Sequence, residues 1–185
     1  MWQTLLTPVD LYCERVGPEL WAEPVNALTN LAFLVAGLWG VREVRRRGTG
    51  IFAEVLAWWV VAIGVGSALF HTFANHGTVW ADVLPIAGFT LAYTLFNLRR
   101  FLGMKWGKAI AIFVAFYAVT GLLTWYNLAG SAIFVVSVIF RIIDPLVCGS
   151  FPLGTHFLWH ILNGLMLGVL LAAAARFGKA VGSRQ

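Results

Sequence analysis

Residues 155–164, THFLWHILNG, begin the last long apolar segment of the chain, which continues to about residue 175. A helix needs roughly 20 apolar residues to cross a bilayer, so this segment predicts a membrane-spanning helix. His156 and His160 stand four positions apart in it and therefore share one helix face. An ionisable side chain inside a span costs at least ~2.5–3.5 kcal/mol, so this pair requires a functional or structural reason.

The rest of the chain is similarly apolar, because 60% of its 185 residues are hydrophobic and only 11% are charged. A soluble domain of this length has too small a core to bury so much apolar surface. We therefore expect an all-α, polytopic membrane helix bundle of one domain. Residues 1–24 would form an extracytoplasmic N-terminal arm, residues 25–176 the transmembrane bundle and residues 177–185 a cytoplasmic tail. The apolar segments are six, at about 25–41, 55–74, 79–98, 107–125, 130–148 and 155–175.

The positive charges predict how the bundle is oriented. Eleven of the thirteen Lys and Arg residues lie in three polar joints, after the first segment, after the third segment and at the C-terminus. Such joints are cytoplasmic under the positive-inside rule, so the N-terminus would be outside and the C-terminus inside. The net charge of +5 is then an orientation signal, and we expect no nucleic-acid partner.

This orientation requires an odd number of crossings, whereas the apolar segments number six. Either residues 99–148 cross three times, or one segment there is re-entrant or lies flat. The odd arrangement brings the end of the second segment, the start of the third and the start of the sixth to one level of the bilayer. An even arrangement would put the last helix start roughly 30 Å from the other two.

Polar residues occur at each of these three helix ends. Ser67 and His71 stand four positions apart near the end of the second segment, and Asp82 opens the third. Three converging histidines with a fourth position open make a catalytic zinc site, so His71, His156 and His160 are candidate ligands. Asp82 would accept a proton from zinc-activated water, and Ser67 would hydrogen-bond that water or a developing oxyanion.

Each of these residues also has a structural interpretation. A histidine pair four positions apart in a membrane helix often makes hydrogen bonds between helices, and Ser67 beside Gly64 and Gly66 suits close packing of small residues. Asp82 alone suits a helix start. Considered together, the residues favour the metal site. Arg141 and Asp144, three positions apart, are expected to meet as a structural pair on one helix face.

Four stretches together resemble a known family: CER…WAEPVNALTN, GVGSALFHTFANHGTVWADVLPI, FRIIDPLVC and PLGTHFLWHILNG. They are similar to the alkaline ceramidases and bacterial ceramidase-like proteins of the CREST membrane hydrolase superfamily, which also holds adiponectin-receptor-like proteins. The resemblance covers most of the chain outside about 101–138. It implies a seven-helix bundle, zinc on the three histidines, water activation by Asp82, and hydrolysis of the amide bond of ceramide.

The chain departs from the family pattern in two places. One helix fewer than the family has is visible between the third and last segments, with the shortfall between Gly121 and Phe140. Alkaline ceramidases also bind calcium through acidic and amide residues near the N-terminus. Asp10, Glu14 and Glu23 are the candidates here, but a full set of six to eight oxygen ligands is not evident. The alternative is that Glu14 and Glu23 pair with Arg15 or cap the first helix.

The resemblance also supports a disulfide between Cys13 and Cys148, which would both lie on the outer, oxidising face of a bacterial inner membrane. Two inert, buried thiols are the alternative.

These observations give one leading hypothesis and two others. The leading one is a zinc-dependent amidase in the membrane that acts on a ceramide-like N-acyl lipid. The second is a zinc-stabilised receptor or sensor that binds a lipid without turnover. The third is a structural membrane protein that has lost the site. The sequence is silent on the oligomeric state.

Overall fold

The computed structural model describes residues 2–100, 103, 105, 107–108 and 125–178. Within these residues the regular structure is helical, which confirms the predicted all-α membrane bundle. The helices are α1 (Trp2–Leu5), α2 (Pro24–Thr29), α3 (Leu31–Arg47), α4 (Ile51–Phe73), α5 (His76–Arg100), α7 (Trp125–Val147) and α8 (His156–Phe177).

Five spans in the described part of the chain are long and apolar enough to cross a membrane. Helices α2 and α3 together make one span, and α4, α5, α7 and α8 supply the others. The fourth predicted segment, 107–125, lies outside the described residues apart from its ends. The described residues therefore show five spans, against the seven helices that the resemblance implies.

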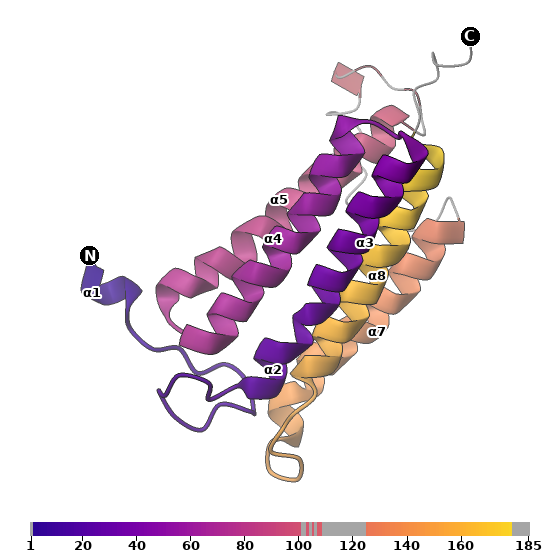
Figure 1. Ribbon diagram of the computed structural model, residues 1–185. Coiled ribbons are helices and arrows are strands. Elements are labelled where there is room, and N and C mark those ends of the chain that lie inside the picture. Colours follow the sequence, from indigo (N-terminus) through magenta and orange to yellow (C-terminus); the bar gives the residue numbers. More distant parts are fainter. Residues whose placement is uncertain (1, 101–102, 104, 106, 109–124, 179–185) are drawn as a thin grey trace.

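The helices alternate in direction (Figure 1). Helices α3, α5 and α8 begin at the end of the bundle where α2 lies, and α4 and α7 finish there. Helix α5 ends, and α7 begins, at the opposite end. The described spans are therefore arranged as the odd-crossing topology requires.

Small residues let the central helices pack closely. Helix α3 contacts both α4 and α8, α7 packs on α8, and α5 packs on α4. A side chain at Gly37 would run into Val61 of α4, and one at Gly164 would run into Ala32 of α3. Such close approach of backbones is how membrane helices gain packing energy, since lipid offers no hydrophobic driving force between them.

The arginines of the last helical turns gather at one end of the bundle. They close α3 (Arg45, Arg46 and Arg47), α5 (Arg99 and Arg100) and α8 (Arg176). Figure 1 shows these three helix ends together, away from α2.

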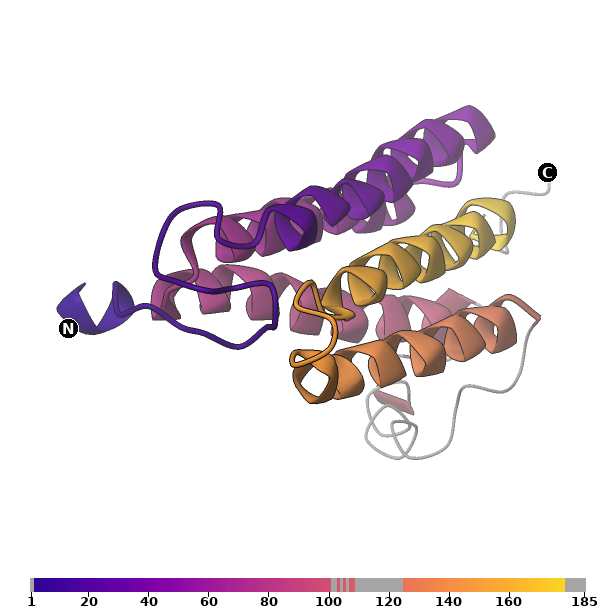
Figure 2. The same ribbon diagram turned by 90° about the horizontal axis from the view of Figure 1, so that it is seen from below.

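The N-terminal arm runs across the other end of the bundle (Figures 1 and 2). A disulfide joins Cys13 to Cys148, just beyond the end of α7, which confirms the predicted pairing. Asp144 reinforces this junction by accepting the backbone N–H of Cys13 at 3.1 Å. The arm is thereby fixed over the ends of α4, α7 and α8.

A buried tri-histidine candidate metal centre

The three predicted ligand histidines come together inside the bundle. His71 lies in the last turn of α4, and His156 and His160 lie in the first two turns of α8. One ring nitrogen from each lies within 4.8 Å of the others. The three residues are buried, with 0%, 1% and 0% of their whole surfaces exposed. Two helices distant in the sequence thus bring together the ligand types that zinc prefers.

Hydrogen bonds occupy one nitrogen on two of these rings. His71 Nδ1 lies 2.6 Å from Glu23 Oε2, and His160 Nδ1 lies 3.0 Å from Thr29 Oγ1. The Nε2 atoms of His71 and His160, and both ring nitrogens of His156, have no hydrogen-bond partner among the described residues. Buried polar atoms are normally paired because an unpaired one costs about 1–3 kcal/mol. The residues present therefore fit a metal ion at their centre.

Glu23 fixes the orientation of His71. Its other carboxylate oxygen, Oε1, lies 2.5 Å from the Nε of Arg15. The side-chain amide of Asn26 donates to Oε2 at 3.2 Å, the same oxygen that bonds His71. Burial raises the pKa of Glu23, but hydrogen bonds from His71, Arg15 and Asn26 outweigh that effect and hold the pKa below its usual value. An ionised Glu23 accepts the Nδ1–H of His71, which leaves Nε2 as the free lone pair. This carboxylate–histidine arrangement is characteristic of zinc sites.

Thr29 fixes His160 in the same way. The Thr29 hydroxyl donates to the carbonyl oxygen of Val25 at 2.8 Å, in the preceding turn of α2. With its proton used there, the hydroxyl oxygen accepts the Nδ1–H of His160. Nε2 of His160 then also carries a free lone pair toward the centre.

Aromatic rings surround the histidines. Tyr12 of the arm stacks on His156 with ring centroids 3.5 Å apart, and Trp159 lies parallel to His156 at 5.3 Å. Phe33 approaches His160 edge-on at 6.3 Å. Such an apolar shell limits the access of bulk water to the centre.

Ser67 of α4 and Asp82 of α5 lie near each other where these two helices pack together. A side chain at Gly66 would collide with the carbonyl of Ala81. Because glycine has no side chain, the two helices approach closely here, beside Ser67 and Asp82. Both are buried, and Asp82 lies within electrostatic range of His71. Ser67 Oγ and Asp82 Oδ1 find no hydrogen-bond partner in the described part of the chain. Ser67 also lies close enough to the Asp82 carboxyl to interact with it, so the two residues form a buried polar pair.

The three acids considered as calcium ligands have different surroundings. Asp10 is exposed, and the described residues contain no metal-ligand group that unites it with Glu14 and Glu23. Glu14 instead accepts the backbone N–H groups of Val25 and Asn26 at 2.6 and 2.8 Å, at the start of α2. Glu14 and Glu23 therefore make the helix cap and the ion pair with Arg15 that the sequence offered as the alternative to a calcium site.

Asp144 also differs from its predicted role. Its Oδ1 accepts the backbone N–H groups of Thr155 and His156 at 2.6 and 2.8 Å, where α8 begins. Arg141 lies over the ring of Trp159 instead, 5.1 Å from its centroid. The predicted Arg141–Asp144 pair is absent from the ion pairs of the described residues, because the unsatisfied N–H groups of a helix start compete for the carboxylate.

Glu23, Thr29 and Tyr12 are the contributions that sequence reasoning did not assign to this centre. A weak signal exists for two of them. Glu23, Asn26 and Asn30 recur at helical spacing in an otherwise apolar stretch, and Thr29 adjoins that face. Nothing in the pattern around Tyr12 indicates that its ring stacks on a histidine.

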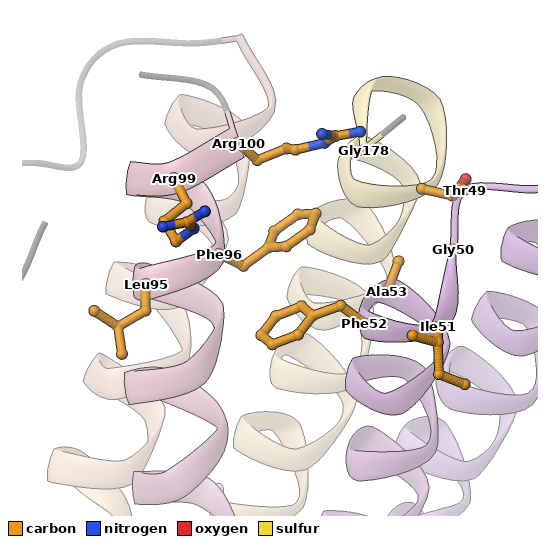
Figure 3. A pocket seen from close by; sticks show the side chains of 10 residues that line it. All are labelled: Thr49, Gly50, Ile51, Phe52, Ala53, Leu95, Phe96, Arg99, Arg100 and Gly178. Carbon is orange, nitrogen blue, oxygen red and sulfur yellow. The ribbon is translucent and has the colours of Figure 1, made fainter. Parts of the chain in front are cut away.

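A cavity of about 380 Å³ lies at the other end of α4 and α5 (Figure 3). Its lining includes Phe52, Phe96, Arg99 and Arg100, together with the Gly50 backbone at the start of α4. Because His71 and Asp82 stand at the opposite ends of the same two helices, this cavity is separate from the histidine centre.

The fold and the centre define a class: a polytopic helical membrane protein with three buried histidines able to hold a metal ion. The family model described as Ceramidase matches residues 11–151, and the chain therefore belongs to the Ceramidase family. The matched range includes Ser67, His71 and Asp82 and ends before His156. No curated protein matches the sequence. Family membership implies a hydrolase of the membrane with a lipid substrate.

Proposed function

We propose that this protein is a zinc-dependent intramembrane hydrolase that cleaves the amide bond of a ceramide-like N-acyl lipid. The observation that carries the proposal is the convergence of three buried imidazoles whose Nε2 atoms, on His71 and His160, are left unpartnered by the bonds to Glu23 and Thr29. Membership of the Ceramidase family supplies the substrate class.

His71, His156 and His160 would hold the zinc ion. When bound, zinc polarises the substrate carbonyl and lowers the pKa of a water molecule toward ~7. The two hydrogen-bonded histidines are held in one tautomer and one orientation. These two ligands are therefore already oriented before a metal ion binds.

Asp82 is the proton carrier in this proposal. Its carboxylate accepts a proton from the attacking water and then gives it to the amide nitrogen as the C–N bond breaks, so that a free amine leaves. Ser67 Oγ donates a hydrogen bond to the oxyanion that develops on the carbonyl oxygen. Burial strengthens both interactions, because water does not compete for these groups.

The substrate would enter sideways from the lipid. We place the arginine-rich end of the bundle on the cytoplasmic side of a bacterial inner membrane, with the N-terminal arm and the histidine centre near the outer face. The clustering of helix-terminal arginines at one end supports this orientation. An engineered cysteine near the end of α8 that reacts with an impermeant label from outside would contradict it.

A receptor that binds lipid around a structural zinc ion is the second candidate. The near-complete burial of the three histidines favours it, because a closed centre suits a structural metal. Turnover separates the two candidates.

The test combines metal content with turnover of a labelled N-acyl sphingoid lipid in detergent or nanodiscs. We expect about one zinc per chain, lost in His156→Ala and retained in the matched control His76→Ala, whose histidine lies at the start of α5 outside the centre. We expect release of the fatty acid by wild type and by Asp10→Ala, and none by Asp82→Ala. Wild-type protein that holds zinc but releases no fatty acid would favour the receptor.

A further inference from the structure

Arg15 is a buried cation on the N-terminal arm, with 6% of its surface exposed. Its guanidinium contacts three oxygen atoms from three parts of the chain. Nε lies 2.5 Å from Glu23 Oε1, Nη1 lies 3.0 Å from the carbonyl oxygen of Gly17, and Nη2 lies 3.4 Å from the carbonyl oxygen of His71. A carboxylate and backbone carbonyls are also the ligands that calcium takes in proteins.

We propose that the guanidinium of Arg15 is a built-in cation that takes the place of calcium beside the histidine centre, so that this protein needs no calcium ion. Arg15 is then a positioning residue, which acts on the centre through Glu23. The inference takes the centre of the proposed function as the group that Arg15 supports.

Both oxygens of each carboxylate next to Arg15 already have partners, and the amide oxygens of Asn26 and Asn30 are left without one among the described residues. Calcium requires six to eight oxygen ligands. Both oxygens of Glu14 accept backbone N–H groups of α2, and Asp10 is exposed. Glu23 gives one oxygen to Arg15 and the other to His71 and Asn26. A divalent ion here would also meet the positive charge of Arg15 at short range.

The charge balance shows why a cation is needed here. The side chains of Arg15 and Glu23 are 3% and 1% exposed. A buried carboxylate without a counter-ion is strongly destabilising, whereas a buried and fully hydrogen-bonded pair is tolerated. Without Arg15, the buried carboxylate of Glu23 would lose its counter-ion, and the hydrogen bond by which Glu23 orients His71 would be disturbed.

The arm holds this cation in place. The backbone N–H of Arg15 donates to the carbonyl oxygen of Tyr12 at 3.1 Å, and the neighbouring Cys13 is tied to Cys148 by the disulfide. An arginine side chain on a fixed arm cannot be removed by a chelator. We therefore expect the protein to be indifferent to agents that remove calcium but leave zinc.

The first experiment measures calcium binding itself on the full-length, zinc-loaded protein in detergent. Thermal unfolding is followed with added calcium chloride, with magnesium chloride at equal ionic strength, and with a calcium chelator in a zinc-buffered solution. Terbium luminescence reports occupancy of any calcium-type site. We expect equal melting temperatures and no saturable terbium signal. A calcium-specific rise in melting temperature, or saturable terbium binding, would overturn the proposal.

The second experiment changes Arg15 and measures melting temperature and bound zinc. We expect Arg15→Ala to lose zinc and to melt earlier, and Arg15→Lys to retain part of both. Added guanidinium ion at low millimolar concentration should restore zinc in Arg15→Ala, whereas urea, a neutral molecule of similar shape, should not. Equal zinc content in wild type and Arg15→Ala, or equal rescue by urea, would contradict the proposal that the charge of Arg15 supports the histidine centre.

A double variant keeps the test informative if Arg15→Met does not fold. Arg15→Met combined with Glu23→Gln removes both charges at once. We expect it to melt above Arg15→Met alone, because no uncompensated charge remains buried. Additive losses would contradict the charge-pair argument. None of these readouts uses lipid hydrolysis, so they stand apart from failure of the proposed activity.

Discussion

Glu23 and His71, 48 residues apart in the sequence, meet through a hydrogen bond of 2.6 Å between Oε2 and Nδ1. Both side chains are 1% exposed. The bond links the start of the first span to the end of the second, at the level where α8 delivers the other two histidines. The candidate metal centre is thus built from three helices, although only two of them supply ligands.

The first prediction concerns this bond. Glu23→Gln keeps the size of the side chain but removes the charge that fixes the Nδ1–H tautomer of His71. We expect zinc affinity to fall about 10–100-fold, as is usual for the partners of metal-binding histidines. Competition with a zinc-sensitive dye measures it.

Glu14→Gln is the matched control for that variant. Glu14, on the N-terminal arm, also contacts the start of α2, but it bonds backbone N–H groups there and no histidine. We expect it to lower stability and leave zinc affinity unchanged. Equal losses of zinc in the two variants would mean that the arm acts only through folding.

The second prediction concerns Thr29. Thr29→Val removes the hydroxyl that accepts from His160 Nδ1 and leaves that nitrogen buried without a partner. The cost is about 1–3 kcal/mol, which we expect to appear as weaker zinc binding of roughly 5–150-fold. Thr72→Val is the control, because the Thr72 hydroxyl bonds only the carbonyl of Ala68 one turn earlier among the described contacts. If both valine variants bind zinc as wild type does, the orientation of His160 comes from packing alone.

The third prediction concerns the Cys13–Cys148 disulfide. It closes a loop with a sequence separation of 135, and bonds of this kind stabilise by about 2–4 kcal/mol. We expect reduction to lower the melting temperature and also to loosen Tyr12 and Arg15, so that zinc dissociates faster. The control is a Cys13→Ser, Cys148→Ser double variant, whose behaviour reductant should not change. A reduced wild type with an unaltered zinc off-rate would show that the arm is held without the bond.

The spans, the convergence of the histidines and the disulfide could be predicted from the sequence. Long apolar runs fix the helices, and polar residues are so costly inside them that His71, Asp82 and His156 stand out. The positive-inside rule then predicts which helix ends share a level of the bilayer, although the count of six apolar segments alone gives the opposite parity. These arguments need only the positions of residues along the chain, whereas the disulfide is supported by the resemblance to the ceramidase family.

The supporting residues could not be predicted in the same way. The sequence leaves Glu23 open between a calcium site and a pair with Arg15, whereas its bond to His71 depends on how α2 packs against α4. Helical spacing pairs Asp144 with Arg141, whereas in the structure its carboxylate accepts hydrogen bonds from backbone N–H groups at the start of α8. Which donor wins depends on tertiary contacts that spacing does not encode.

The fourth prediction uses the pH dependence of Tyr12. Burial away from water raises the pKa of the Tyr12 phenol from 10.0 to about 12, so the folded state holds this proton more tightly than the unfolded state. The sign follows from linkage: the contribution is fully present below pH 10 and is lost as the pH rises from about 10 to 12. We expect Tyr12→Phe, which keeps the ring on His156, to lose less stability than wild type over that range. Identical denaturation curves at high pH would show that Tyr12 titrates freely.

The last prediction concerns the contact between α4 and α5. A methyl group at Gly66 would run into the carbonyl of Ala81, next to Asp82, so Gly66→Ala must push the two helices apart. Because His71 and its partners do not lie at that contact, we expect the variant to keep its zinc and to lose most of its amide hydrolysis as Ser67 and Asp82 separate. Gly168→Ala is the matched control, since a methyl group there meets only Ala36 at an ordinary 3.7 Å. A Gly66→Ala protein that hydrolyses as fast as the control would mean that the spacing of α4 and α5 does not set the geometry of the proton carrier.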